Sequence, residues 1–377
     1  MPPISVLMKP SSGMCNMKCD YCFYCDETQK RIQESYGFMS EQTLKNVIRK
    51  TMLRAEGAVS YAFQGGEPTL AGLDFYRDLV AYVTAHENPK KLKIHYALQT
   101  NGYLINEEWA EFLGKNHFLV GVSLDGLKEI HDRYRLDAAG KGTYQRVISA
   151  IRLLEKHQVE YNILTVVTAA TARNGQKIYN YFKKNHFGYQ QYIECLDPIG
   201  EEPGQHEYSL TPEKYGEFLK SMFDAWYLDM RSGTYVYNRY FENLMMIMAG
   251  QQPESCNMRG VCGKQWVFEA DGSVYPCDFY ALDQWCLGNI NKNSFEEMDQ
   301  KRDELGFIQW SMRQQEDCQK CRWFGLCRNG CRRNREPVTA EHTNRNYFCK
   351  SYQMFFEYAY PRLREIYQLY MAGRIRK

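Results

Sequence analysis

Short apolar runs alternate with amphipathic stretches along roughly the first 230 residues of the chain. The β-rich runs predict six strands, at residues 4–9, 59–63, 93–99, 119–124, 160–167 and 189–194. Helices are expected after them, at residues 41–56, 73–88, 107–116, 144–157, 172–185 and 212–232. In the first of these helices, Leu44, Val47, Ile48 and Met52 recur at the spacing of one buried face. Six consecutive β/α units predict an α/β fold with a parallel sheet, either doubly wound or a partial (β/α)6 TIM-like barrel.

Composition and charge narrow the class of protein. The chain has 377 residues, 44% of them hydrophobic, which is enough for one large core and a smaller domain. Its net charge of +2 gives no electrostatic reason to expect nucleic acid or an anionic membrane as partner. No signal peptide or membrane-spanning run is evident, so we expect a cytoplasmic protein. Its 14 cysteines then indicate metal or redox chemistry rather than structural disulfides.

Three cysteines near the start of the chain carry the strongest chemical signal. Cys15, Cys19 and Cys22 have the spacing Cys-x3-Cys-x2-Cys, which suits three thiolates that hold a [4Fe–4S] cluster and leave one iron open. An open iron can bind and activate a ligand, which favours an enzyme. Cys25 offers an alternative set with Cys19 and Cys22, but that set leaves Cys15 without a role.

Polar and glycine-rich segments follow the predicted strands. They are Gln64, Gly65, Gly66, Glu67 and Pro68 after the second strand, Thr100, Asn101 and Gly102 after the third, and Ser123 at the end of the fourth. In parallel α/β folds the active site lies at the carboxyl ends of the strands. These segments should therefore meet the three-cysteine loop, which follows the first strand, at one edge of the sheet.

A second group of eight cysteines occupies the last third of the chain. It comprises Cys256, Cys262, Cys277, Cys318, Cys321, Cys327, Cys331 and Cys349. Eight thiols suffice for two closed four-cysteine sites, and their spacing is compatible with zinc as well as with iron–sulfur clusters. Cys195 and Cys286 fit neither group and are expected to be small buried apolar residues.

The first motifs resemble those of the radical S-adenosylmethionine (SAM) enzymes. Their Cys-x3-Cys-x2-Cys motif matches the triplet, and their Gly-Gly-Glu-Pro motif matches residues 65–68. In that family the open iron binds SAM, and one electron splits it to a 5′-deoxyadenosyl radical. The resemblance places Tyr21 and Leu196 at the adenine, Gly66 at the methionine amino group, Ser123 at the ribose and Arg135 at the methionine carboxylate. Taken singly, the glycine pair before Glu67 could be only a tight turn, Ser123 a helix cap and Arg135 half of a surface ion pair.

Behind such a core, the later cysteines resemble the SPASM extension, which binds two auxiliary [4Fe–4S] clusters. The resemblance assigns Cys256, Cys262, Cys277 and Cys331 to one cluster and Cys318, Cys321, Cys327 and Cys349 to the other. With the SAM-binding cluster, that makes three. The same resemblance divides the chain into a radical SAM partial barrel at residues 1–235, a SPASM domain at 236–350 and a C-terminal helix at 351–377.

The segment from Val274 to Tyr280 resembles that of the anaerobic sulfatase-maturating enzymes, which oxidise a cysteine or serine of a sulfatase to Cα-formylglycine. The resemblance makes Asp278, directly after a cluster ligand, the general base, although it could instead order the cluster loop through backbone hydrogen bonds. Tyr24 could contact the peptide or SAM, or belong to the core. A SPASM enzyme that forms thioether or carbon–carbon links in a ribosomal peptide is the alternative.

The resemblance also implies partners. We expect a sulfatase polypeptide with a Cys/Ser-x-Pro-x-Arg segment, an electron donor such as flavodoxin or ferredoxin, and a monomeric enzyme. The sequence leaves the choice between cysteine and serine open.

Overall fold

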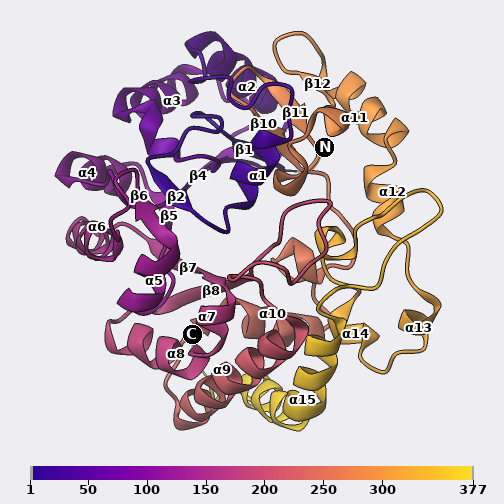
Figure 1. The fold of residues 1–377 in the computed structure, drawn as a ribbon. Coiled ribbons are helices and arrows are strands. Elements are labelled where there is room, and N and C mark those ends of the chain that lie inside the picture. The colour runs from indigo at the N-terminus through magenta and orange to yellow at the C-terminus, as the bar shows by residue number, and fades with distance from the viewer. Residues whose placement is uncertain (1–2, 376–377) are drawn as a thin grey trace. The chain divides into compact units, whose positions relative to one another are not determined.

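The computed structural model describes residues 3–375, which form two compact units (Figure 1). Unit 1 comprises Met1–Ser123, Asp132–Tyr161 and Lys264–Leu305. Unit 2 comprises Leu124–His131, Asn162–Gly263 and Gly306–Lys377. Residues 264–305, predicted from sequence to lie in the SPASM domain, thus belong to the same unit as the cysteine triplet. The division at residues 235 and 350 stays a prediction.

The sheet of unit 1 has the strand order β12-β11-β10-β1-β3-β4-β5. The strands are β1 (Ile4–Met8), β3 (Ala58–Phe63), β4 (Lys93–Thr100), β5 (Phe118–Ser123), β10 (Trp266–Phe268), β11 (Ser273–Tyr275) and β12 (Gly288–Asn289). β1, β3, β4 and β5 pair in parallel, as expected for consecutive β/α units. β10 extends this parallel sheet at the free edge of β1, and β11 and β12 continue it in antiparallel pairing. Residues more than 250 positions apart in sequence therefore become neighbours.

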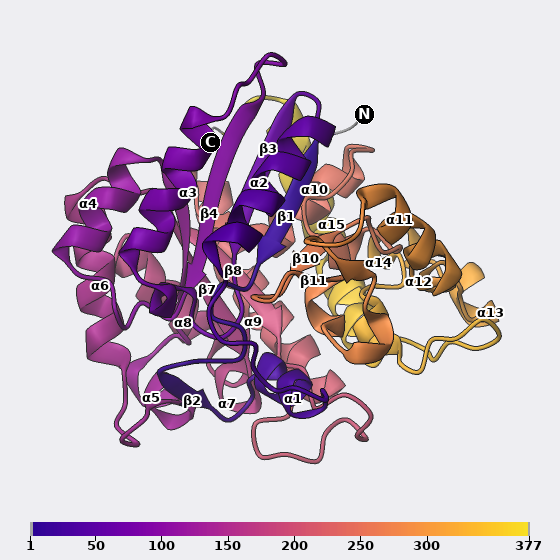
Figure 2. The ribbon, with the colours of Figure 1, turned by 90° about the horizontal axis from the view of Figure 1, so that it is seen from above.

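Helices cover the parallel strands of unit 1 (Figure 2). They are α2 (Glu41–Arg54), α3 (Leu73–Ala85), α4 (Glu107–Lys115) and α6 (Tyr144–Lys156). Ser40 caps the start of α2 by accepting a hydrogen bond from the Thr43 amide. The four apolar residues predicted to share one face of this helix are all buried. Thr51 joins α2 to β3 through a 2.9 Å hydrogen bond with Tyr61.

Unit 2 contains three parallel strands and most of the longer helices. The strands are β7 (Tyr161–Val167), β8 (Tyr189–Glu194) and β9 (Tyr237–Asn238), and the helices include α7 (Ala169–Ala172), α8 (Gly175–Lys184), α9 (Pro212–Ser232), α10 (Arg239–Met248) and α15 (Cys349–Met371). α9 packs along α15, where Phe223 and Phe355 meet edge to face with ring centroids 5.6 Å apart. The short α12 (Phe307–Ser311), α13 (Glu316–Gln319) and α14 (Phe324–Cys327) lie between these long helices in sequence.

All six predicted strands are present, with their ends shifted by one residue at most, and the parallel α/β architecture is confirmed. The helix predicted at 172–185 is instead two helices, because the chain leaves helical geometry at Asn174. The C-terminal helix begins earlier than expected, at Cys349, and ends at Met371. Within residues 3–375, no helix is long and apolar enough to cross a membrane.

Candidate functional site

The three-cysteine loop leaves the carboxyl end of β1 and leads into α1 (Phe23–Gln29). Each thiol of the triplet accepts a hydrogen bond: Cys15 from the Met17 amide at 3.4 Å, Cys22 from the Cys25 amide at 3.4 Å, and Cys19 from Arg135 Nη1 at 3.9 Å. N–H donors around sulfur stabilise thiolates, and they tune iron–sulfur clusters. The surroundings of the triplet therefore fit a cluster.

Gly65 and Gly66 bring the loop after β3 against two other segments. A Cβ atom on Gly66 would lie 2.2 Å from the Met14 carbonyl oxygen, and the residue has a φ of +54°. A Cβ on Gly65, at φ +110°, would lie 2.7 Å from the Lys9 ammonium. Only glycine allows both close approaches. The glycine pair thus joins the cysteine loop to the end of β1.

Glu67 fixes the next two loops from a buried position. Its carboxylate accepts hydrogen bonds from the Thr69 amide at 3.0 Å, from the Thr100 hydroxyl at 2.7 Å and from the Asn101 amide at 2.7 Å. Burial raises the pKa of Glu67, while these donors act in the opposite direction. Asn101 in turn donates to Asn16 at 2.8 Å, inside the cysteine loop. The predicted convergence of the loops after β1, β3 and β4 is therefore present.

Three of the residues predicted to bind SAM lie close to the cysteine loop or to its neighbours. β6 (Arg135–Asp137) pairs with β2 (Met17–Cys19), which sets Arg135 opposite Cys19. The Arg135 guanidinium carbon lies 5.4 Å from the ring centroid of Tyr21. Ser123, at the end of β5, accepts a 3.2 Å hydrogen bond from Gln99. Leu196 belongs to unit 2, two residues beyond β8, and its role stays a prediction.

Asp278 lies in a buried polar pair that the sequence did not indicate. It begins a 3-10 turn directly after Cys277, and its carboxylate forms an ion pair with Lys9. Gln64 donates to the other carboxylate oxygen at 2.6 Å. The Lys9 side chain is fully buried, so its charge has little solvent to compensate it. Each Asp278 oxygen retains a further lone pair that can accept a proton.

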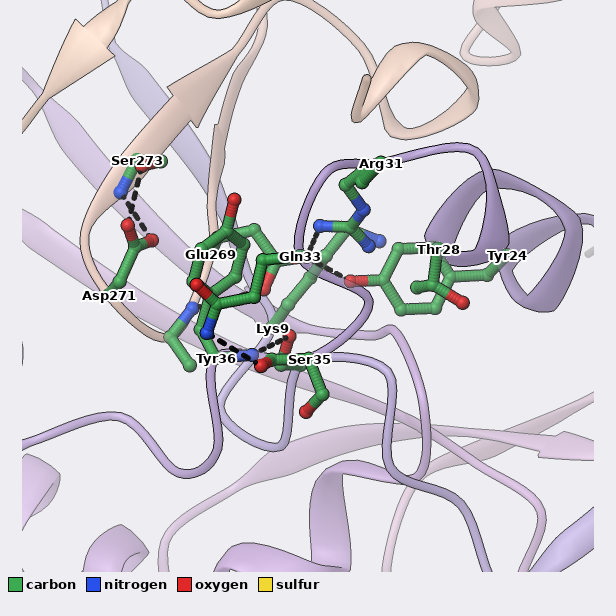
Figure 3. A network of polar contacts seen from close by, with 12 residues as sticks. Lys9, Tyr24, Thr28, Arg31, Gln33, Ser35, Tyr36, Glu269, Asp271 and Ser273 are labelled. Carbon is green, nitrogen blue, oxygen red and sulfur yellow. Dashed lines mark hydrogen bonds and ion pairs between the residues drawn. The ribbon is translucent and has the colours of Figure 1, made fainter. Parts of the chain in front are cut away.

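Tyr24 is buried, and it lies near Lys9, Arg31 and Glu269 (Figure 3). The Lys9 ammonium lies 3.7 Å from the ring centroid of Tyr24. The Tyr24 hydroxyl donates to Glu269, whose Oε1 also pairs with Arg31 Nη1 at 2.7 Å. Burial, and next the negative charge of Glu269, raise the pKa of Tyr24 well above its usual value. Whether Tyr24 also contacts substrate stays a prediction.

The cysteines of unit 2 gather in two groups. Burial, and then the nearby thiols of Cys349, Cys318 and Cys321, raise the pKa of Cys327 to about 12. Burial raises the pKa of Cys331 too, with the neighbouring Cys256 and Cys262 thiols adding to the shift. The assignment of these cysteines to two clusters stays a prediction. Cys277, the remaining expected ligand, lies in unit 1.

The described thiols are not grouped around a site for a single metal ion. In the part of the chain that the structure describes, no three His, Cys, Asp or Glu side chains are close enough to hold one ion. A [4Fe–4S] cube needs more widely spaced thiolates, because each binds a different iron. All 14 cysteines are free thiols. Cys195 is buried, as expected, whereas Cys286 is only partly buried: it packs against an apolar cluster that includes Tyr24 and Tyr275, and its thiol donates to the Gly288 carbonyl at 3.5 Å.

Lys9, Glu269 and Arg31 are not among the residues predicted from sequence, and Gln64 is predicted only as part of the loop after the second strand. The one local signal for Lys9 is a charged residue at the end of an otherwise apolar strand, immediately before the cysteine loop. Glu269 follows β10, and nothing in the periodicity of the chain indicates that β10 pairs with β1.

Two family models match the chain, one over the segment with the cysteine triplet and one over the later cysteines. Residues 10–177 match the radical SAM superfamily, and residues 256–322 match an iron–sulfur cluster-binding domain, SPASM. The second match favours iron–sulfur clusters over zinc for the later cysteines.

Whole-chain relatives give a closer comparison. The chain is 49% identical to the cysteine-type anaerobic sulfatase-maturating enzyme of Clostridium perfringens, over 96% of this chain and 98% of the relative. It is 30% identical to the serine-type enzyme of Bacteroides thetaiotaomicron, over 95% and 90%. Among solved structures, native anSMEcpe with bound AdoMet and the Cp18Cys peptide matches with a TM-score of 0.92 at 48% identity, covering 97% of this chain and 99% of that one. Streptococcus suis SuiB bound to its precursor peptide SuiA shares only the fold, with a TM-score of 0.65 at 17% identity, over 92% and 76%.

Proposed function

Because the chain belongs to the anaerobic sulfatase-maturating enzymes of the radical SAM superfamily, we propose that it oxidises a cysteine of a sulfatase polypeptide to Cα-formylglycine. Identity of 49% to the cysteine-type relative, against 30% to the serine-type relative, favours cysteine over serine. The substrate segment would have the form Cys-x-Pro-x-Arg.

The chain's own residues would hold the cofactors. Cys15, Cys19 and Cys22 would bind the cluster that receives SAM, and the eight later cysteines would bind two auxiliary clusters. When bound, these groups supply a 5′-deoxyadenosyl radical that takes a hydrogen atom from the substrate Cβ, and an acceptor for one further electron. Tyr21, Gly66, Ser123, Arg135 and Leu196 would position SAM. For Arg135, a guanidinium fork suits the methionine carboxylate.

The buried Asp278 carboxylate, held by Lys9 and Gln64, is the observation that carries the proposal. Oxidation of a thiol-bearing carbon to a thioaldehyde removes one hydrogen atom from Cβ, one proton from sulfur and one electron. Asp278 would accept the proton, and water would then replace sulfur and release hydrogen sulfide. Lys9 and Gln64 restrict the carboxylate to one orientation, which favours proton transfer at a fixed atom.

The remaining partners extend the same proposal. A small electron-transfer protein such as flavodoxin or ferredoxin would reduce the SAM-binding cluster. The enzyme would act as a monomer in the cytoplasm, where a reducing environment preserves the 14 free thiols.

A peptide assay tests the proposal. Anaerobically reconstituted enzyme is incubated with SAM, a reductant and a peptide containing Cys-x-Pro-x-Arg, alongside otherwise identical peptides with serine or alanine at the reactive position. Mass spectrometry after hydrazine labelling should show an aldehyde with the cysteine peptide, less with serine and none with alanine. A cross-linked cysteine peptide without aldehyde would instead indicate the thioether chemistry of other SPASM enzymes.

A further inference from the structure

Arg302 is a buried cation without a hydrogen-bonded partner among the described residues. It lies in the last turn of α11 (Phe295–Glu304) and is 1% exposed. None of its three guanidinium nitrogens makes a hydrogen bond within residues 3–375. A guanidinium removed from water without hydrogen bonds is strongly unfavourable unless an anion compensates it.

The neighbouring carboxylate does not fill this role. Asp299 Oδ1 lies 3.8 Å from Arg302 Nε, beyond hydrogen-bond range. The same carboxylate already pairs with Arg54 Nη2 at 2.8 Å and with Lys264 Nζ at 2.9 Å. Asp299 therefore has two nearer cations than Arg302, and Arg302 feels the charges of Asp299 and Asp303 but makes no hydrogen bond with either.

Packing holds the Arg302 guanidinium at the open end of the β10–β11 hairpin, opposite its turn. The guanidinium carbon lies 4.4 Å from the ring centroid of Trp266, the first residue of β10. Phe295, seven residues earlier on α11, meets the same ring edge to face at 4.6 Å. The helix start is itself fixed by a capping box between Ser294 and Glu297.

The hairpin also brings Arg302 to a proposed cluster ligand. In the antiparallel pairing, Val267 lies opposite Tyr275, so the start of β10 adjoins the end of β11. Cys277 follows β11 after one further residue. Burial lowers the pKa of Arg302 to about 10, while the negative charges of Asp299, Asp303 and then Cys277 act in the opposite direction.

We propose that Arg302 faces the auxiliary cluster bound through Cys277 and donates hydrogen bonds to its sulfurs, which raises the reduction potential of that cluster. A cluster with four thiolate ligands is negatively charged, and nearby positive charge and N–H donors favour its reduced form. Arg302 would thus be a positioning residue that makes this cluster the better electron acceptor. The inference rests on the proposed function for the identity of the cluster, but concerns its potential rather than catalysis.

The test is a redox titration followed by electron paramagnetic resonance. Cys15, Cys19 and Cys22 are replaced by alanine so that only the auxiliary clusters contribute, and Arg302→Met, Arg302→Lys and Arg54→Met are compared in this background. Arg54 is the matched control, because it shares Asp299 but stacks on Phe295, at 5.0 Å, instead of Trp266. Arg302→Met should lower the potential of one auxiliary cluster and leave the other unchanged, Arg302→Lys should restore part of the shift, and Arg54→Met should have little effect.

Unchanged potentials in Arg302→Met, or equal shifts in Arg302→Met and Arg54→Met, would overturn the inference. Loss of roughly four irons from both Arg302 variants would also overturn it, because the role would then be packing. Loss from Arg302→Met alone would support direct contact through charge. None of these outcomes depends on turnover, so failure here is distinguishable from failure to form the aldehyde.

Discussion

Lys9 and Asp278 form a buried ion pair although they lie 269 positions apart in the sequence. The pair exists because β10 adds to the free edge of β1, which brings the segment after β11 beside the end of β1. Gly65 packs against the Lys9 side chain, and the adjacent Gly66 packs against the cysteine loop. The proposed base and the proposed SAM-binding loop are therefore held by one short segment of the chain.

Lys9→Met should separate radical formation from aldehyde formation. The substitution leaves the buried Asp278 carboxylate without its cation, and breaking such pairs costs about 3–5 kcal/mol. We expect at least about tenfold less formylglycine, with SAM still cleaved to 5′-deoxyadenosine. Chromatography of the nucleoside and mass spectrometry of the peptide measure the two products.

Lys90→Met is the matched control for this variant. Lys90 also belongs to unit 1, but its ammonium caps the backbone carbonyl of Leu53 at the surface. Both products should remain at wild-type levels. An unaltered ratio of aldehyde to nucleoside in Lys9→Met would contradict the role given to the ion pair.

Gly66→Ala should disrupt the cysteine loop. The new Cβ would lie 2.2 Å from the Met14 carbonyl, in a backbone conformation that alanine rarely adopts. We expect loss of roughly four of 12 irons on reconstitution, measured by iron assay. Gly72→Ala is the control, since Gly72 has a similar φ of +83° but no atom within 4 Å of its added Cβ. Equal iron content in both variants would show that the close approach is unimportant.

Cysteine-to-serine variants test the partition of the auxiliary ligands. Cys318→Ser and Cys327→Ser should each weaken the same cluster, and combining them should add no further iron loss. Cys262→Ser should affect the other cluster, so its loss should add to that of Cys327→Ser. Cys195→Ser should keep roughly 12 irons. Additive losses from the first two substitutions would place Cys318 and Cys327 in different clusters.

Tyr24→Phe should change stability in alkaline solution. The raised pKa of Tyr24 means that the folded chain binds this proton more tightly than the unfolded chain. The stabilisation of the folded state by this raised pKa is therefore complete below pH 10, the usual tyrosine pKa, and is lost as the pH rises toward the pKa of Tyr24 in the folded state. The fall in melting temperature between pH 9 and pH 11 should be shallower in Tyr24→Phe than in wild type. Tyr189→Phe, at the surface, should follow wild type, and identical slopes in all three would contradict the prediction.

Short sequence motifs predicted those residues of the site that lie within a few positions of one another in the chain. The triplet spacing, Gly66 and Arg135 could be recognised because each lies in a short segment with its own pattern, and the structure brings Arg135 to Cys19. Lys9 and Glu269 could not be recognised from sequence, because their environment depends on the pairing of β1 with β10. Parallel edge pairing between distant segments leaves no periodicity in either one.

Asp278→Asn tests the account most directly. The variant keeps the size of the side chain but removes the proposed proton acceptor. Asp271→Asn, in the turn between β10 and β11, is the control. Within residues 3–375 the Asp271 carboxylate accepts hydrogen bonds only from Ser273, two residues away, at 2.9 Å from its backbone amide and 2.7 Å from its hydroxyl. The decisive measurement is formylglycine formed per 5′-deoxyadenosine released, followed in one time course. We predict that this ratio falls at least about a hundredfold in Asp278→Asn and stays at the wild-type value in Asp271→Asn. A wild-type ratio in Asp278→Asn would contradict the assignment of Asp278 as the base.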